Sequence, residues 1–360
     1  MSEPIRFFLP GPTYVMEEVR EAMTAPSIGH RSTAFKELYA SLTPGLQAVL
    51  RTSGDVLVAT GSATLLMEAA VISTVRRRVL NLTCGAFSER WHAISQAVGK
   101  EADRVSVPWG EIVTPDLVRE ALRRGRYDAV TVVHNETSTG VMNPLSEIAG
   151  AIREESDALI LVDTVSSLGG APVETDAWGL DVVVSGSQKA LALPPGIAVA
   201  ALSERAAERA GEVSPRGFYT DLLRYRDKHR AGGTITTPCI PVFLALARQL
   251  QRIEEEGMEA RWARHRELRR RAEDWAAANG WSYASSPEGA SWTVSCVRPP
   301  EGVTPADVLG AAVDQGFTVG GGYGDWKPTT LRIGHMGEVR LQDLDALLEV
   351  LATAAVAQVG

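Results

Sequence analysis

The sequence predicts an α/β protein whose main domain is built on a mostly parallel β-sheet. Between residues 55 and 202, short apolar segments alternate with segments of helical periodicity. The apolar segments are continuous rather than alternating, as expected for strands that are buried on both faces. A strand–helix–strand rhythm also places helices over a parallel sheet. These observations predict a sheet of seven strands, covered by helices on both sides.

Seven apolar segments are the predicted strands. They are Val56–Ala59, Val79–Leu82, Val105–Val107, Ala129–Val133, Leu159–Val162, Val182–Val184 and Ile197–Ala201. Helical periodicity predicts helices between most of them, at Ala63–Val75, Ser88–Val98, Pro115–Arg123 and Leu145–Glu155.

The pattern changes after residue 203, which predicts a second, smaller α/β domain. Arg205–Arg230 is rich in arginine and is expected to be an irregular surface connection, and Pro241–Asn279 is expected to be one long helix. Strands are predicted at Trp292–Val297 and Thr330–Ile333, and helices at Pro305–Gln315 and Leu341–Val356. We therefore expect a large domain at residues 15–255 and a small domain at residues 256–360, joined by residues 1–14.

Composition limits the kinds of partner that the chain can have. Its 360 residues suffice for two domains, and 45% hydrophobic with 22% charged residues is ordinary globular composition. A net charge of −8 argues against general nucleic-acid binding, and the basic tract at residues 264–271 is expected to be a solvated helix face. No apolar run approaches the roughly 20 residues that cross a membrane.

The cysteines and the N-terminus point to a reducing compartment. Cys84, Cys239 and Cys296 are far apart and form no C-x-x-C pair, which predicts neither a disulfide framework nor a zinc site. The segment Met1–Arg6 lacks the features of a signal peptide. We expect a cytoplasmic protein without a bound metal.

Three polar segments follow predicted strands directly: His134–Gly140, Asp163–Gly170 and Ser185–Lys189. Ligands bind at the carboxyl ends of parallel strands, so these segments are expected to form one site. Lys189 could place an amine there, ready to form a Schiff base with a carbonyl cofactor. Taken alone, a lysine at the end of a strand is more often simply solvated.

Four further features fit such a site, although each also has an ordinary structural explanation. Thr60–Thr64 places small residues and hydroxyls at a helix start, which suits a phosphate or a plain N-cap. Asp163 could pair with a protonated ring nitrogen or act as a turn residue. Phe87 could lie on an aromatic ring or pack in the core. Arg332 could bind a carboxylate or form a structural salt bridge.

In this order, the segments resemble the class V aminotransferases, most closely the alanine–glyoxylate and serine–pyruvate branch. The resemblance covers about residues 9–337 and includes Leu9–Thr13, Gly29–Ser32, Thr60–Thr64, Cys84–Arg90, Asn135–Gly140, Val162–Gly170, Ser185–Lys189 and Leu331–Gly334. It implies an enzyme of fold type I that depends on pyridoxal 5′-phosphate and has a large domain with a seven-stranded sheet and a small C-terminal domain.

The resemblance also implies roles for individual residues. Lys189 would carry the cofactor as a Schiff base, Asp163 would pair with its ring nitrogen, and Phe87 would stack on its ring, where many relatives have tryptophan. The phosphate would be held by Ser62, Ala63, Thr64 and Gln188, with Thr237 reaching it from a neighbouring subunit of a homodimer. Ser138 would lie near the ring 3′-oxygen, and Arg332 with Gly11 would bind the substrate. Some relatives have glycine at the position of Ala63 and tyrosine at the position of Thr234.

The implied reaction is a ping-pong transfer of an amino group from alanine or serine to glyoxylate or pyruvate. An aspartate or phosphoserine donor would need a second cation, for which the candidates are His30, Arg31, His229, Arg230 and Lys327. A cysteine desulfurase of this class usually has histidine where this chain has Phe87 and Gln188, and a mobile nucleophilic cysteine, whereas Cys296 falls in a predicted strand. A non-catalytic subunit would be expected to have lost Lys189 or Asp163.

Overall fold

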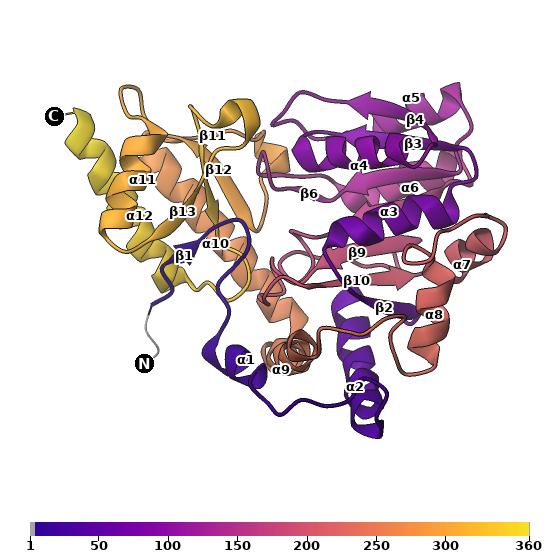
Figure 1. The fold of residues 1–360 in the computed structure, drawn as a ribbon. Coiled ribbons are helices and arrows are strands. Elements are labelled where there is room, and N and C mark those ends of the chain that lie inside the picture. Colours follow the sequence, from indigo (N-terminus) through magenta and orange to yellow (C-terminus); the bar gives the residue numbers. More distant parts are fainter. Residues whose placement is uncertain (1–3, 360) are drawn as a thin grey trace.

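The computed structural model describes residues 4–359 and contains two main β-sheets, each packed against its own helices (Figure 1). The larger sheet has the strand order β2-β10-β9-β8-β5-β3-β4. Its strands are β2 (Asp55–Thr60), β3 (Arg78–Thr83), β4 (Glu101–Ser106), β5 (Ala129–Val133), β8 (Leu159–Asp163), β9 (Val182–Gly186) and β10 (Ile197–Leu202). Strand β10 pairs antiparallel with β2 and β9, and the other neighbouring strands of this sheet pair in parallel. The predicted fold class is confirmed, and the seven strands are the seven that were predicted.

Consecutive strand residues pack on opposite faces of this sheet. Val58 and Val132 belong to one hydrophobic cluster, whereas Leu57 and Val133 belong to the other. The first cluster also takes side chains from α2 (Thr33–Leu50), α5 (Pro115–Arg124), α6 (Leu145–Glu155) and α9 (Ile240–Glu256). The second takes them from α3 (Ala63–Thr74), α4 (Ala86–Ala97), α7 (Glu204–Gly211) and α8 (Leu222–Arg230). Both faces are therefore buried, as the continuous apolar segments predict.

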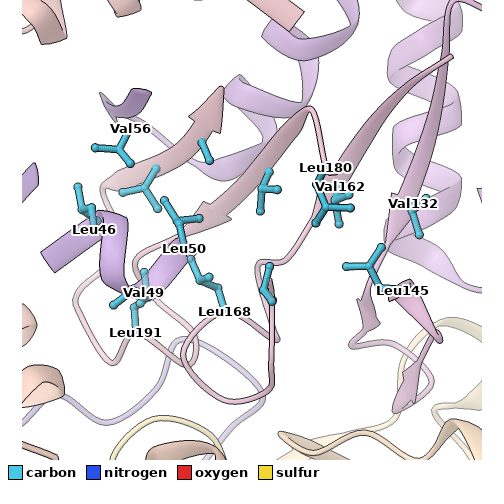
Figure 2. Packing of buried hydrophobic residues seen from close by; sticks show 14 of the residues in the cluster. Leu46, Val49, Leu50, Val56, Val132, Leu145, Val162, Leu168, Leu180 and Leu191 are labelled. Atoms are coloured by element: carbon cyan, nitrogen blue, oxygen red, sulfur yellow. The ribbon is translucent and has the colours of Figure 1, made fainter. Parts of the chain in front are cut away.

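The loops that follow Asp163 and Lys189 are each anchored by a leucine in the first hydrophobic cluster. Figure 2 labels Leu168 and Leu191 among its residues, together with Val49 and Leu50 of α2. Leu191 follows Lys189 by two residues and Leu168 follows Asp163 by five. Burial of each leucine is worth about 2 kcal/mol, which holds these loops against the sheet.

The smaller sheet has the order β1-β13-β14-β12-β11 and lies beside the larger one with the C-terminal helices (orange and yellow in Figure 1). Its strands are β1 (Phe7–Phe8), β13 (Thr318–Gly321), β14 (Leu331–Gly334), β12 (Val294–Arg298) and β11 (Ser282–Tyr283), with helices α10 (Met258–Ala278), α11 (Pro305–Asp314) and α12 (Leu341–Val359). A short hairpin, β6 (Asn135–Glu136) with β7 (Val141–Met142), follows β5.

The N-terminal segment belongs to this smaller sheet by its pairing, because β1 lies parallel to β13. The assignment of residues 1–14 to the small domain stays a prediction. The boundaries at residues 15–255 and 256–360 stay a prediction, and residues 1–3 and 360 lie outside the described part of the chain.

The structure differs from the sequence-based expectation in several segments. The single helix predicted at Pro241–Asn279 is two helices, α9 and α10, because Gly257 between them has φ +79°, a left-handed conformation that favours glycine. The connection predicted as irregular contains α7 and α8, and α1 (Glu17–Ala22) and α2 were not predicted. Strand β4 begins four residues before the apolar segment, since an edge strand tolerates polar side chains.

The basic tract on α10 is paired with acidic residues. Arg264 binds Glu256, and Arg271 binds Asp345 of α12. Among residues 4–359, no helix is both long enough and apolar enough to cross a membrane.

Candidate active site

A cavity of about 130 Å³ opens where β5, β8 and β9 end. It is lined by Ser62, Ala63, Thr64, Met67, Phe87, Arg90, Asn135, Thr137, Asp163, Val165, Ser166, Gln188 and Lys189. The three polar segments that follow strands thus meet at one site, as predicted. Of the predicted site residues, Gly11, Ser138, Thr237 and Arg332 are not on the cavity wall.

Lys189 lies in the turn after β9, and its environment makes the amine unusually acidic. Burial and, to a smaller extent, the charge of Arg332 lower its pKa from 10.5 to about 8, against the opposing effect of Asp163. Its Nζ donates a hydrogen bond to the carbonyl of Pro10 and lies 5.8 Å from the ring centroid of Phe87. A neutral amine is a nucleophile, so this environment favours attack on a carbonyl group.

Asp163 ends β8 with its carboxyl group buried. Its Oδ1 accepts a hydrogen bond from the backbone N–H of Val165 at 2.7 Å. Burial raises the pKa of this carboxyl group from 3.8 to about 7, although the bond from Val165 opposes the rise. Its second oxygen has no hydrogen-bond partner in residues 4–359. A buried carboxylate in this state gains from a cation, such as a protonated ring nitrogen, placed beside it.

The start of α3 offers an anion site on the same wall. Ser62 is the N-cap residue, yet its side chain makes no capping hydrogen bond. The hydroxyl and the first N–H groups of this 12-residue helix are therefore available at the positive end of the helix dipole. Gln188 lies beside this turn, because a Cβ on Gly186 would come within 2.8 Å of Gln188 Oε1 and 3.4 Å of Ala63 Cβ.

Phe87 is held at the start of α4 by a buried carboxylate. The backbone N–H groups of Phe87 and Ser88 donate to Glu136 Oε2 at 3.1 and 2.9 Å. The guanidinium of Arg90 lies 4.8 Å from the Phe87 ring centroid. Since the Phe87 ring also lines the cavity, it can lie against a flat aromatic ligand.

Ser138 lies behind this arrangement instead of on the cavity wall. Its hydroxyl donates to Glu136 Oε1 at 2.6 Å and accepts from the N–H of Ala86 at 3.1 Å. Thr137 and Asn135 face the cavity instead, and Asn135 Nδ2 is a buried donor without a partner in residues 4–359. Alternate residues of an extended segment point in opposite directions, a signal that sequence reasoning could have used here.

Gly11, in the loop after β1, packs against the Lys189 side chain, and Arg332 of β14 is close enough to affect the charge of its amine. Gly11 has φ +107°, and a Cβ on it would lie 2.4 Å from Lys189 Cδ, so only glycine fits there. Arg332 donates from Nε to the carbonyl of Gly321 at 2.9 Å and from Nη1 to the carbonyl of Thr137 at 3.2 Å. Its guanidinium forms no ion pair with a carboxylate in residues 4–359, which leaves its charge available for a ligand.

Thr237 is exposed, just before α9. Its predicted contact is with a second copy of the chain and stays a prediction.

The donor set fits pyridoxal phosphate. It combines an amine of lowered pKa, a buried carboxylate with one unpaired oxygen, a ring to stack upon and a helix N-terminus for the phosphate. Asn135 Nδ2 adds an unpaired buried donor beside them. Each group has the chemistry that one part of this cofactor needs.

Comparisons with known proteins agree with this site. The family model described as aminotransferase class-V matches residues 22–340. An uncharacterised aminotransferase of Methanocaldococcus jannaschii is 39% identical over 96% of this chain and 90% of that protein. Serine–glyoxylate aminotransferase of Methylorubrum extorquens is 34% identical over 92% of this chain and 86% of its own length.

Among solved structures, an aspartate aminotransferase from Thermus thermophilus superposes with a TM-score of 0.91. It is 31% identical, and the match covers 98% of this chain and 100% of that one. The chain therefore belongs to the class V aminotransferases and is a transaminase that uses pyridoxal phosphate.

Proposed function

We propose that this transaminase takes its amino group from a small amino acid, alanine or serine, and passes it to glyoxylate or pyruvate. The observation that carries the proposal is Arg332, whose guanidinium is held by two backbone carbonyl groups, forms no ion pair with a carboxylate in residues 4–359 and lies close enough to Lys189 to lower its pKa. It can bind the one carboxylate that every 2-amino acid and 2-oxo acid shares. The similarity to a serine–glyoxylate aminotransferase supports a small donor.

The alternative is a dicarboxylate or phosphorylated donor. The similarity to an aspartate aminotransferase is consistent with a dicarboxylate donor. Arg230 is bound to Asp55 at 2.8 Å, and His229 packs on Tyr39. His30, Arg31 and Lys327 do not line the cavity.

Besides Lys189, the cationic side chain on the cavity wall is Arg90, and its guanidinium lies over the Phe87 ring. It would have to leave that ring to bind a second carboxylate, so we favour the small donor.

The position of Cys296 argues against cysteine desulfurase activity. This cysteine is fully buried in β12, and burial raises the pKa of its thiol to about 11. A buried thiol on a strand is a poor nucleophile.

The geometry of the site supports the following roles for its residues. When bound, pyridoxal phosphate supplies an aldehyde for an amine and a ring that accepts electrons. The start of α3 and Gln188 hold the phosphate, and Phe87 orients the ring. Asp163 keeps a proton on the ring nitrogen. Arg332 would bind the substrate carboxylate with Gly11 beside it. Lys189 Nζ would take the proton from the substrate α-carbon and deliver it to the cofactor carbon that carried the aldehyde.

We also propose a homodimer in which Thr237 of each protomer completes the phosphate site of the other. The exposure of Thr237 beside α9 supports this arrangement.

The three free cysteines support a further proposal, that the protein is located in the cytoplasm.

A panel of donors and acceptors tests the function. The absorbance of the protein-bound cofactor should fall when alanine or serine is added and return when glyoxylate or pyruvate follows. Aspartate or phosphoserine acting clearly faster than alanine and serine would overturn the substrate assignment.

A further inference from the structure

Tyr323 lies between the two groups that would hold the donor. Its ring centroid is 5.3 Å from Arg332 Cζ and 5.7 Å from the ring centroid of Phe87. Arg332 would bind the donor carboxylate, and Phe87 would cover the cofactor ring. Tyr323 does not line the cavity itself, so its phenol ring would meet a donor side chain only where that side chain extends past Phe87 and Arg332.

The segment that carries Tyr323 is packed firmly in place. It precedes the short 3-10 helix η2 (Gly324–Trp326), and the Trp326 ring meets the Trp109 ring of the larger domain at 5.7 Å, edge to face. Arg298 lies over the Trp326 ring at 5.1 Å. Next to Tyr323, a Cβ on Gly322 would lie 2.4 Å from Thr330 Oγ1. Gly322 is buried and the Trp326 ring is held between Trp109 and Arg298, so the backbone on both sides of Tyr323 is anchored.

The hydroxyl of Tyr323 has no hydrogen-bond partner in residues 4–359. The side chain is partly exposed, and its ring contacts Phe87 and the guanidinium of Arg332. A phenol hydroxyl without a hydrogen-bond partner can donate a hydrogen bond to a short polar side chain of a bound donor amino acid.

We propose, on the basis of the function proposed above, that Tyr323 is the residue that limits the donor to a side chain of one or two heavy atoms. The donor carboxylate is fixed at Arg332, and its α-carbon must come within reach of Lys189 Nζ. The side chain then meets the ring of Tyr323 after its β-carbon and one further atom. The substrate class is a 2-amino acid with methyl, ethyl or hydroxymethyl at the α-carbon.

The alternative is that Tyr323 only supports Arg332 through a cation–π contact. The two roles differ in what a substitution changes. Loss of support weakens binding of every donor alike, whereas loss of a wall changes the dependence on side-chain length.

The test compares the wild-type enzyme with Tyr323→Ala and with Tyr323→Phe, which keeps the ring. The donors are alanine, 2-aminobutyrate, norvaline and norleucine, with kcat and KM measured separately for each. In the wild type, kcat/KM should fall roughly tenfold or more between 2-aminobutyrate and norvaline, as one extra methylene can do in a closed pocket. Tyr323→Ala should remove that step, chiefly through KM, and Tyr323→Phe should retain it.

A second measurement is independent of turnover. Propionate, butyrate, valerate and hexanoate are titrated into the holoenzyme, and their dissociation constants are read by calorimetry. Affinity should drop with the longer chains in the wild type and not in Tyr323→Ala. A Tyr323→Ala profile that declines at the same carbon as the wild type in both series would overturn the proposal.

The outcomes separate this inference from the proposed function. If the wild type accepts none of the four donors, the proposed function fails, and the carboxylate series alone decides the role of Tyr323. If Tyr323→Ala does not fold, as judged by circular dichroism, Tyr323→Val removes most of the ring and takes its place in the comparison.

Discussion

At the scale of single residues, burial gives Lys189 and Asp163 complementary chemistry. It lowers the pKa of the amine to about 8 and raises that of the carboxyl group to about 7. Both shifts have the same cause, because a buried charge without a close partner is costly. A cofactor that forms a bond with the amine and brings a cation to the carboxylate relieves both costs at once.

The lowered pKa predicts how the cofactor-free protein captures pyridoxal phosphate. Only the neutral amine attacks the aldehyde, and at a pKa of about 8 roughly a tenth of it is neutral at pH 7. The rate of covalent attachment should rise up to about pH 8 and then level off. Stopped-flow absorbance measures this rate, with Nα-acetyl-lysine as the free-amine control. A rate that keeps rising through pH 10, as it should for the control, would contradict the assignment.

Sequence reasoning located Lys189, Asp163 and the start of α3 because strand ends in a parallel sheet meet at one edge. It placed the segment His134–Gly140 at the site but assigned no role to Asn135 or Thr137 within it, and it did not identify Tyr323. Tyr323 meets Phe87 only after the two domains pack together, and nothing in its local pattern marks that contact.

At the scale of secondary-structure elements, α10 fastens the lysine loop to the smaller domain through Arg261, whose side chain is fully buried. Arg261 Nε donates to the carbonyl of Gly169 at 3.0 Å, and Nη2 donates to the carbonyl of Ala190 at 3.0 Å. Its guanidinium also binds Glu338 at 2.9 Å. One side chain thus ties together the loops after β8, β9 and β14.

Removal of Arg261 should be strongly destabilising. Arg261→Met leaves Glu338 short of a buried partner and two carbonyl groups without donors, and it should lower the free energy of unfolding by about 3–5 kcal/mol. The matched control is Arg270→Met on the same helix, whose ion pairs with Glu267 and Asp274 are exposed and whose loss should cost at most about 1 kcal/mol. Urea unfolding of the cofactor-free proteins measures both, and equal losses would count against the structural role of Arg261.

Element prediction succeeded for strands that are buried on both faces. It missed α1, α2, α7 and α8, and it missed a helix break that depends on one residue. The strands β5 and β8 are continuous apolar segments and were predicted closely. The break between α9 and α10 depends on Gly257 adopting a positive φ, and a lone glycine in an amphipathic stretch does not reveal that.

At the scale of the whole molecule, the proposed homodimer has a direct consequence for cofactor binding. Light scattering should give about twice the chain mass of 38.6 kDa. Thr237→Ala should weaken pyridoxal phosphate binding about tenfold without changing that mass, because a single phosphate hydrogen bond is worth roughly 1.5 kcal/mol. Thr24→Ala, which changes another exposed threonine, is the control. A monomer with full activity would refute the shared site.

The most direct test of the account is to identify the lysine that holds the cofactor. The holoenzyme is treated with borohydride, which reduces the covalent link between pyridoxal phosphate and the protein, and the digested peptides are mapped by mass spectrometry. The account predicts the cofactor mass on the peptide that contains Lys189, and no such label in Lys189→Ala. A label on a different lysine, or an unchanged label in Lys189→Ala, would contradict it.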